Sequence, residues 1–116
     1  MRVAGVAALI VAKAHKLGER MRDAPRRMEP KDALDMLRLL RATQTDRLAE
    51  TVQRLFADPR AGDVTREAMS FLRALFTDPD APGLVLVGEA VGRLDDPAMV
   101  RASTRSLVDE LLTAAT

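Results

Sequence analysis

Three basic side chains, Lys13, Lys16 and Arg20, have the spacing most suited to chemistry in this chain of 116 residues. On a helix, residues 16 and 20 lie about 60° and about 20° around the axis from residue 13, so all three share one narrow stripe. Several cations at fixed spacing suit a polyphosphate. The same pattern is also typical of a solvated helix edge whose aliphatic stems cover neighbouring apolar surface.

Two acidic side chains follow on the next predicted helix. Asp32 and Asp35 are three residues apart and project from one side, and Lys31 is four residues from Asp35 and could pair with it. Two carboxylates this close can hold Mg²⁺ or position a base. Acids in a first helical turn more commonly stabilise the helix dipole. The single histidine, His15, points about 200° away from Lys13, and we interpret it as a packed or surface side chain.

Composition excludes several classes of site. The sequence has no Cys, Trp or Tyr, one His and three Phe, which rules out a disulfide framework, a thiol nucleophile and a Cys- or multi-His metal site. We therefore assign no catalytic residue and no metal ligand. Residues 1–41 hold ten Lys/Arg and five Asp/Glu, whereas residues 42–116 hold eight and twelve. The first third is basic, but with no Trp or Tyr and only three Phe for base stacking a nucleic-acid partner is not expected.

Apolar periodicity predicts an all-α protein, a single bundle of five to six helices over residues 1–116. The first two predicted helices cover about 4–22 and 30–42. The third follows an N-cap at Thr45 or Asp46 and runs to about Ala57, the fourth runs from Gly62-Asp63 to the stop at Asp78-Pro79, and the last begins at Asp96-Pro97 and includes Leu112. The stretch 82–94 is ambiguous: LVLVG at 84–88 could be a strand, but it has no second strand to pair with, so we favour a helix.

The apolar run Val3–Ala12 is half the length of a membrane span and is followed at once by Lys13, so we interpret it as the start of a buried helix. We expect neither a signal peptide nor membrane attachment, and a cytoplasmic location. Gly18 interrupts this helix, which suggests that another backbone packs closely there.

A short sequence occurs twice, as Leu-Phe-Ala-Asp-Pro at 55–59 and as Leu-Phe-Thr-Asp-Pro at 75–79. Two copies are too few for a repeat array. We interpret both as helix ends at an Asp-Pro stop.

Two motifs that follow one another along the chain resemble those of a known family. The stretch A-x-L-I-V-A-K-A-H-K-L-G-E-R at 7–20, followed by K-D-A-L-D-M-L-R-L-L at 31–40, resembles the helical C-terminal half of minimal nucleotidyltransferases. These include the toxin component of bacterial abortive-infection toxin–antitoxin systems. The family pattern is K-x-x-K or K-x-x-x-[KR], then K-D-x-x-D-[LIM]-x-x-L. The matching residues are Lys13, Lys16 and Arg20, then Lys31, Asp32 and Asp35. Residues 7–40 carry the resemblance as a helix pair, and residues 43–116 fit as a helical tail.

The resemblance implies a nucleoside triphosphate near the basic stripe, with Lys13, Lys16 and Arg20 as candidate phosphate contacts. It also implies that Asp32 and Asp35 support the site and that Mg²⁺ is needed for transfer of a nucleoside monophosphate. The family's metal-binding D-x-D lies on an N-terminal sheet, and the one D-x-D here, Asp78-Pro79-Asp80, falls in a predicted loop. We therefore expect a nucleotidyltransferase-like fragment or subunit that is inactive alone.

A truncated or split protein should expose the apolar surface that would cover the missing sheet. We expect exposure of Leu9, Ile10 and Val11 on the first helix and of Leu34 and Leu39 on the second. Such a surface would bind a catalytic-half chain or form a homodimer. The alternative is an all-helical protein-interaction module without a catalytic role. A DNA-binding helical domain is less consistent, because no recognition helix stands out.

Overall fold

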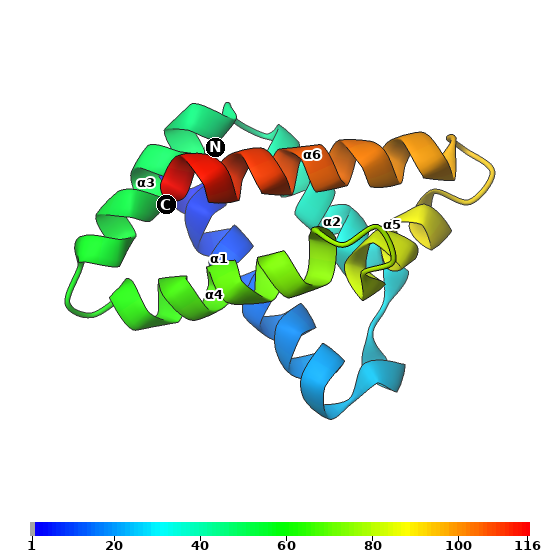
Figure 1. The fold of residues 1–116 in the computed structure, drawn as a ribbon, viewed down its shortest axis with the longest axis horizontal. Helices are drawn as coiled ribbons and strands as arrows, with labels where there is room; N and C mark the ends of the chain where they lie inside the picture. Colours follow the sequence, from blue (N-terminus) through cyan, green and yellow to red (C-terminus); the bar gives the residue numbers. More distant parts are fainter. Residues whose placement is uncertain (1) are drawn as a thin grey trace.

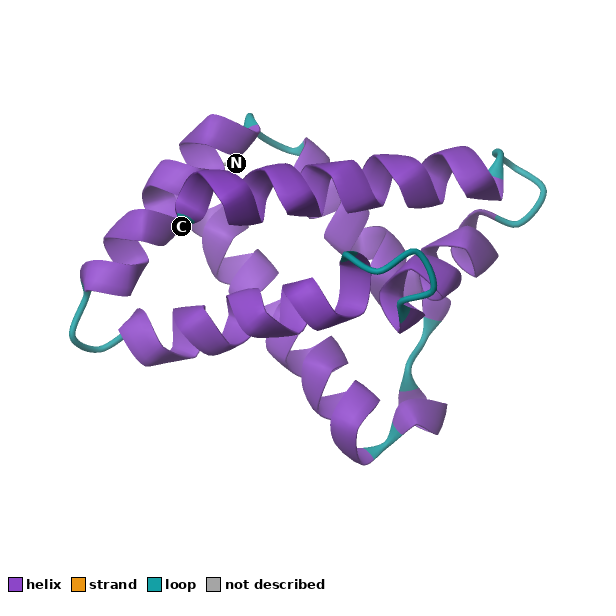
Figure 2. Cartoon of the chain, viewed as in Figure 1, coloured by secondary structure: helices purple, strands orange, loops and turns teal. Residues whose placement is uncertain are grey.

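Six α-helices and one short 3₁₀ turn make up the computed structural model, which describes residues 2–116 (Figures 1 and 2). The elements in chain order are α1 (Val3–Asp23), η1 (Pro25–Arg27), α2 (Pro30–Arg41), α3 (Thr45–Ala57), α4 (Gly62–Phe76), α5 (Pro82–Val91) and α6 (Pro97–Ala115). No strand occurs in this part of the chain, and the ambiguous stretch 82–94 forms helix α5. The predicted all-α bundle is confirmed.

Proline begins three of these helices. Pro30, Pro82 and Pro97 each stand in the first turn of α2, α5 and α6, where the missing N–H costs no hydrogen bond. At α6 the preceding Asp96 also caps the helix, because its carboxylate accepts from the N–H of Ala98 at 3.0 Å. These local signals explain why the predicted boundaries lie close to the observed ones.

The repeated Asp-Pro sequence ends a helix in both places. Asp58 accepts hydrogen bonds from the N–H groups of Arg60 and Ala61 at 2.7 and 3.1 Å, and so closes the turn between α3 and α4. Asp78 accepts from the N–H of Asp80 at 2.9 Å after α4. The repetition therefore reflects one turn chemistry used twice.

Helices from both halves of the sequence build one core. The main contacts are α1 on α4, α2 on α5, α3 on α6 and α5 on α6. Figure 1 shows α4 crossing in front of α1, and α6 running along the long axis of the molecule. The radius of gyration is 13.3 Å, the value expected of one compact domain of this length. The largest fully buried side chains come from all six helices and include Ile10, Met36, Leu48, Phe76, Leu84 and Leu111.

Gly18 is a close-packing point between α1 and α4. A Cβ built at Gly18 would lie 2.1 Å from Cγ of Phe71, so the glycine makes room for an aromatic ring. The sequence predicted close approach of a backbone here. The position was right, but the neighbour is the side chain of Phe71 on α4.

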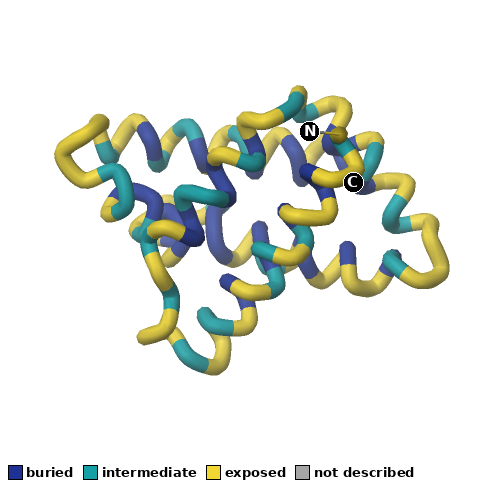
Figure 3. The backbone as a smooth tube through the Cα atoms, turned by 180° about the vertical axis from the view of Figure 1, so that it is seen from behind, coloured by how far each residue is buried: buried dark blue, intermediate teal, exposed yellow. Residues whose placement is uncertain are grey.

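Most of the apolar surface that we expect from the sequence to be exposed is covered in the bundle. Ile10 is buried and Val11, Leu34 and Leu39 are partly buried, so the expectation that these four are exposed was wrong. The reason is that α1 packs against α2, α3 and α4, while α2 packs against α1 and α5, so most of these side chains meet a neighbouring helix. Figure 3 shows buried and exposed positions interspersed along the backbone of the bundle. Of the five residues only Leu9 is exposed, at 43%.

Candidate functional site

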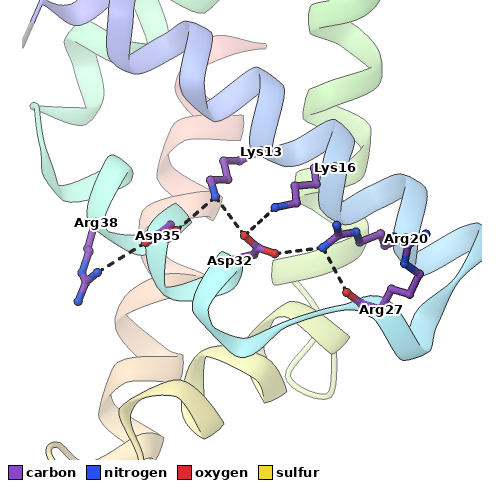
Figure 4. Close-up of polar contacts among 7 residues, drawn as sticks. All are labelled: Lys13, Lys16, Arg20, Arg27, Asp32, Asp35 and Arg38. Atoms are coloured by element: carbon purple, nitrogen blue, oxygen red, sulfur yellow. Dashed lines mark hydrogen bonds and ion pairs between the residues drawn. The ribbon is translucent and has the colours of Figure 1, made fainter.

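A buried carboxylate gathers the three basic side chains of α1. Asp32 in the first turn of α2 is 0% exposed, and it accepts hydrogen bonds from all three (Figure 4). The distances from Oδ1 to Nζ of Lys13 and of Lys16 are both 3.1 Å, and Oδ2 lies 3.3 Å from Nη1 of Arg20. The structure thus brings Lys13, Lys16 and Arg20 together at a single point.

Asp35 extends this arrangement one turn along α2. Its Oδ2 accepts from Nζ of Lys13 at 3.2 Å, and its Oδ1 lies 3.6 Å from Nη1 of Arg38. We call Lys13, Lys16, Arg20, Asp32, Asp35 and Arg38 the Asp32 cluster. Sequence reasoning missed Arg38, although its position three residues after Asp35 on the same helix is a recognisable ion-pair spacing.

The chain between the two helices also contributes. Nη1 of Arg20 donates to the backbone carbonyl of Arg27 at 3.2 Å, so the guanidinium joins the end of η1 to the carboxylate of Asp32. Contacts between α1 and α2 run in opposite sequence order, since Arg20 meets Arg27 and Asp32 while Lys13 reaches Asp35 (Figure 4). The helix pair is therefore antiparallel at the cluster. No sequence pattern specifies the carbonyl contact, because it depends on the turn conformation.

The charges in the cluster shift the pKa values of two of its members. Burial alone would raise the pKa of Asp32, but hydrogen bonds from Lys13 and Lys16 and their positive charges outweigh it and hold the pKa below 3.8. Burial alone would lower the pKa of Lys13, but bonds to Asp32 and Asp35 and their negative charges raise it above 10.5. Both groups are charged at neutral pH.

The cluster carries surplus positive charge. Four cations and two carboxylates leave two positive charges in the set defined above. An ammonium has three N–H donors and a guanidinium has five. Within residues 2–116, Lys16 uses one donor on Asp32, and its side chain is 43% exposed. Arg20 binds both of its acceptors through Nη1 alone. Donors therefore remain on the solvent side.

A shallow groove of about 440 Å³ lies beside these donors on α1. It is lined by Ala12, His15, Lys16, Glu19, Arg20, Asp23 and Ala24. Of its two carboxylates, Asp23 pairs with Arg22 at 3.0 Å, and Glu19 lies 3.8 Å from Nδ1 of His15. An anion in the groove would meet Lys16 and Arg20 as the cations with spare donors.

Two residues considered in the sequence lie outside the Asp32 cluster. Lys31 is exposed and forms no ion pair within the described residues, so the possible Lys31–Asp35 pair is not made; Asp35 bonds to Lys13 instead. His15 packs between α1 and α4, where Nε2 lies 2.9 Å from the carbonyl oxygen of Val64 and its ring meets Phe71 edge-on. We therefore assign His15 a packing role.

Within residues 2–116 no three His, Cys, Asp or Glu side chains lie close enough together to hold a metal ion. None of the helices in the same range is long and apolar enough to cross a membrane. Comparison of the chain with family models, curated proteins and solved structures finds no match in any of the three. The nucleotidyltransferase resemblance therefore rests on the motifs of residues 7–40 alone.

Proposed function

We propose that this chain is a nucleotidyltransferase-like helical subunit or fragment whose Asp32 cluster contacts the phosphates of a nucleotide, and that it is inactive alone. One observation carries the proposal: three cations from α1 converge on one buried carboxylate and still leave surplus positive charge. Five of the six motif residues that resemble the family, Lys13, Lys16, Arg20, Asp32 and Asp35, lie in this cluster, and Lys31 does not.

Asp32 acts as a positioning residue in this proposal. Like charges held close together repel, so Lys13, Lys16 and Arg20 would spread into solvent without a counter-ion between them. The buried carboxylate keeps them at fixed spacing before any ligand arrives. Such preorganisation lowers the entropy cost of binding a phosphate chain. Lys13 bridges Asp32 and Asp35, which leaves Lys16 and Arg20 as the main phosphate contacts.

In this proposal the groups that carry out catalysis lie on another polypeptide. Nucleotidyl transfer depends on metal ions that bridge the phosphates, and the metal-binding carboxylates would have to come from a catalytic half on other polypeptide. Asp32 and Asp35 are already bonded to cations, so they do not serve as magnesium ligands here. When completed, the site would use Mg²⁺ and a nucleoside triphosphate; nucleotide transfer by this chain alone would contradict the proposal.

Binding can be tested by the thermal unfolding midpoint in Mg-ATP and Mg-CTP. Ligand at about 100 times its dissociation constant should stabilise the protein by about 2.7 kcal/mol, about 10 °C for a domain of this size. The double variant Lys16→Ala with Arg20→Ala should lose the shift. Arg54→Ala with Arg93→Ala removes two exposed arginines outside the cluster and should retain it. An equal shift in both double variants, or none in the wild type, would count against the proposal.

A second candidate function is an all-helical protein-interaction module. The observation that favours it is the exposure of large apolar side chains away from the cluster, with Leu94 95% and Met99 67% exposed. Exposed apolar side chains of this size can contribute to a protein contact surface. This candidate predicts that Mg-ATP and Mg-CTP leave the unfolding midpoint unchanged in every variant.

A further inference from the structure

A stripe of six exposed residues runs along the outer face of α1. Its members are Arg2, Gly5, Leu9, Ala12, Lys16 and Glu19, all exposed in the bundle. Arg2 is the N-cap of the helix, and Leu9 is 43% exposed. A helix on the surface of a bundle normally presents polar side chains to water. Here the run from Val3 to Ala12 has no polar side chain on either face.

The spacing of the stripe is that of a helix-pairing seam. Successive members are three, four, three, four and three residues apart, which is the heptad pattern of positions that meet a second helix. The seam spans about 25 Å of helix at 1.5 Å per residue. The inner face of α1 is a different set of residues, and that set is already packed against α2, α3 and α4.

We propose that this stripe pairs with the same stripe of a second copy of the chain, in antiparallel orientation about a two-fold axis. Charge and size complementarity between the two stripes support this pairing. An antiparallel register that places Leu9 on the partner's Ala12 also places Arg2 on the partner's Glu19. It sets Gly5 against the partner's Lys16, where the missing side chain leaves room for the lysine stem.

The parallel arrangement lacks this complementarity. It would place Arg2 on the partner's Arg2 and Glu19 on the partner's Glu19, which are repulsive contacts at both ends of the seam. Two-fold dimers with isologous contacts are also the commonest homo-oligomers. In such a dimer the same surface is buried on both copies, so neither stripe stays exposed. The stripe shares Ala12, Lys16 and Glu19 with the groove beside the Asp32 cluster, so a dimer and a nucleotide in that groove would compete for the same surface. The inference depends on the apolar centre of the stripe and is tested by self-association without nucleotide, so its failure is distinguishable from failure of nucleotide binding.

Sedimentation velocity over a concentration series tests the inference in the intact chain. We expect a reversible dimer with a dissociation constant in the micromolar range. Leu9→Asp should weaken association at least tenfold, and Ala12→Glu, at a second exposed position, should do the same. Val85→Asp is the matched control, because Val85 on α5 is also 43% exposed and lies outside the stripe; it should leave the dimer unchanged.

The charged ends test the orientation. Arg2→Glu alone should weaken the dimer several-fold, because it faces a carboxylate on the partner. The double variant Arg2→Glu with Glu19→Arg should restore wild-type association. Introduced cysteines give a second readout, since the chain has none of its own. Leu9→Cys with Ala12→Cys should form an intermolecular disulfide, whereas Gly5→Cys should not, because the two copies of that position would be about 16 Å apart.

Three results would overturn the proposal. A single species of 12.7 kDa at every concentration would show that the chain is monomeric and that the stripe does not bind a second copy. Undiminished association of Leu9→Asp would place the dimer contact elsewhere. Cross-linking of Gly5→Cys would show a parallel pair.

Discussion

Replacement of Asp32 by asparagine tests the structural role of the cluster most sharply. The substitution keeps the shape of the side chain but removes the charge that Lys13, Lys16 and Arg20 share. The new side chain would retain one carbonyl acceptor where the carboxylate offered two oxygens, and its amide N–H₂ would face cations. The expected result is a folded but less stable protein.

The size of the loss follows from burial. Removing one partner of a fully buried ion pair costs about 3–5 kcal/mol. Asp32 is fully buried, but the side chains of Lys13, Lys16 and Arg20 are 24%, 43% and 25% exposed and can regain water. We therefore expect a loss of about 2–3 kcal/mol, or a midpoint about 10 °C lower for a domain of this size.

The pH dependence gives an independent check. Because the pKa of Asp32 is lowered in the folded state, its stabilising contribution is present above about pH 3.8 and is lost as the pH falls through the folded value. The raised pKa of Lys13 acts in the opposite range: its contribution is present below about pH 10.5 and is lost as the pH rises through the folded value. The difference between wild type and Asp32→Asn should therefore be constant between about pH 5 and pH 9 and shrink at lower pH.

Urea or thermal unfolding followed by circular dichroism measures this difference. Asp23→Asn is the control, because Asp23 pairs with Arg22 at 3.0 Å with both side chains largely exposed, and it should leave the midpoint almost unchanged. The cluster does not hold α1 to α2 if Asp32→Asn lowers the free energy of unfolding no more than Asp23→Asn does. The same conclusion follows if the loss caused by Asp32→Asn does not decrease at acid pH.

Three further substitutions test the packing by their unfolding midpoints. Gly18→Ala should destabilise the protein by about 1–3 kcal/mol, because its Cβ would overlap the ring of Phe71; a neutral result would mean that this contact is loose. Gly88→Ala should instead stabilise α5 by about 0.5–1 kcal/mol, since its Cβ would meet the flexible side chain of Arg101 at 3.3 Å; a loss would show that Arg101 cannot move. Asp96→Ala should cost about 1 kcal/mol through loss of the cap on α6, and an unchanged midpoint would show that the cap is dispensable.

The positions of the helices could be predicted because local chemistry determines where they end. Proline, Asp-Pro and Asp96 mark helix ends through short-range sterics and hydrogen bonds, so the helices appear in the sequence pattern. Apolar periodicity also identifies these segments as helices. Helix pairing depends on contacts distant in sequence, so nothing local indicates that α1 packs on α4 or that Phe71 fills the space over Gly18.

Five of the six members of the Asp32 cluster could be predicted from the sequence, but Arg38 and the arrangement of the cluster could not. Periodicity places Lys13, Lys16 and Arg20 on one stripe, and it places Asp32 and Asp35 on one side of the next helix. It does not show that the two sets face each other, because that depends on the turn at η1 and on the burial of Asp32. The exposure of Ile10 was predicted wrongly for the same reason: a nearly continuous apolar run does not show which of its faces the bundle will cover.

The most direct test of the account is a heteronuclear NMR titration with magnesium tripolyphosphate, which carries the phosphate chain without a base. If the Asp32 cluster binds phosphate, chemical-shift changes will concentrate at Lys16, Arg20 and the first turn of α2 and will be lost in Lys16→Ala with Arg20→Ala. Unchanged spectra at millimolar ligand, or changes spread equally over the exposed arginines of α3 and α6, would contradict it.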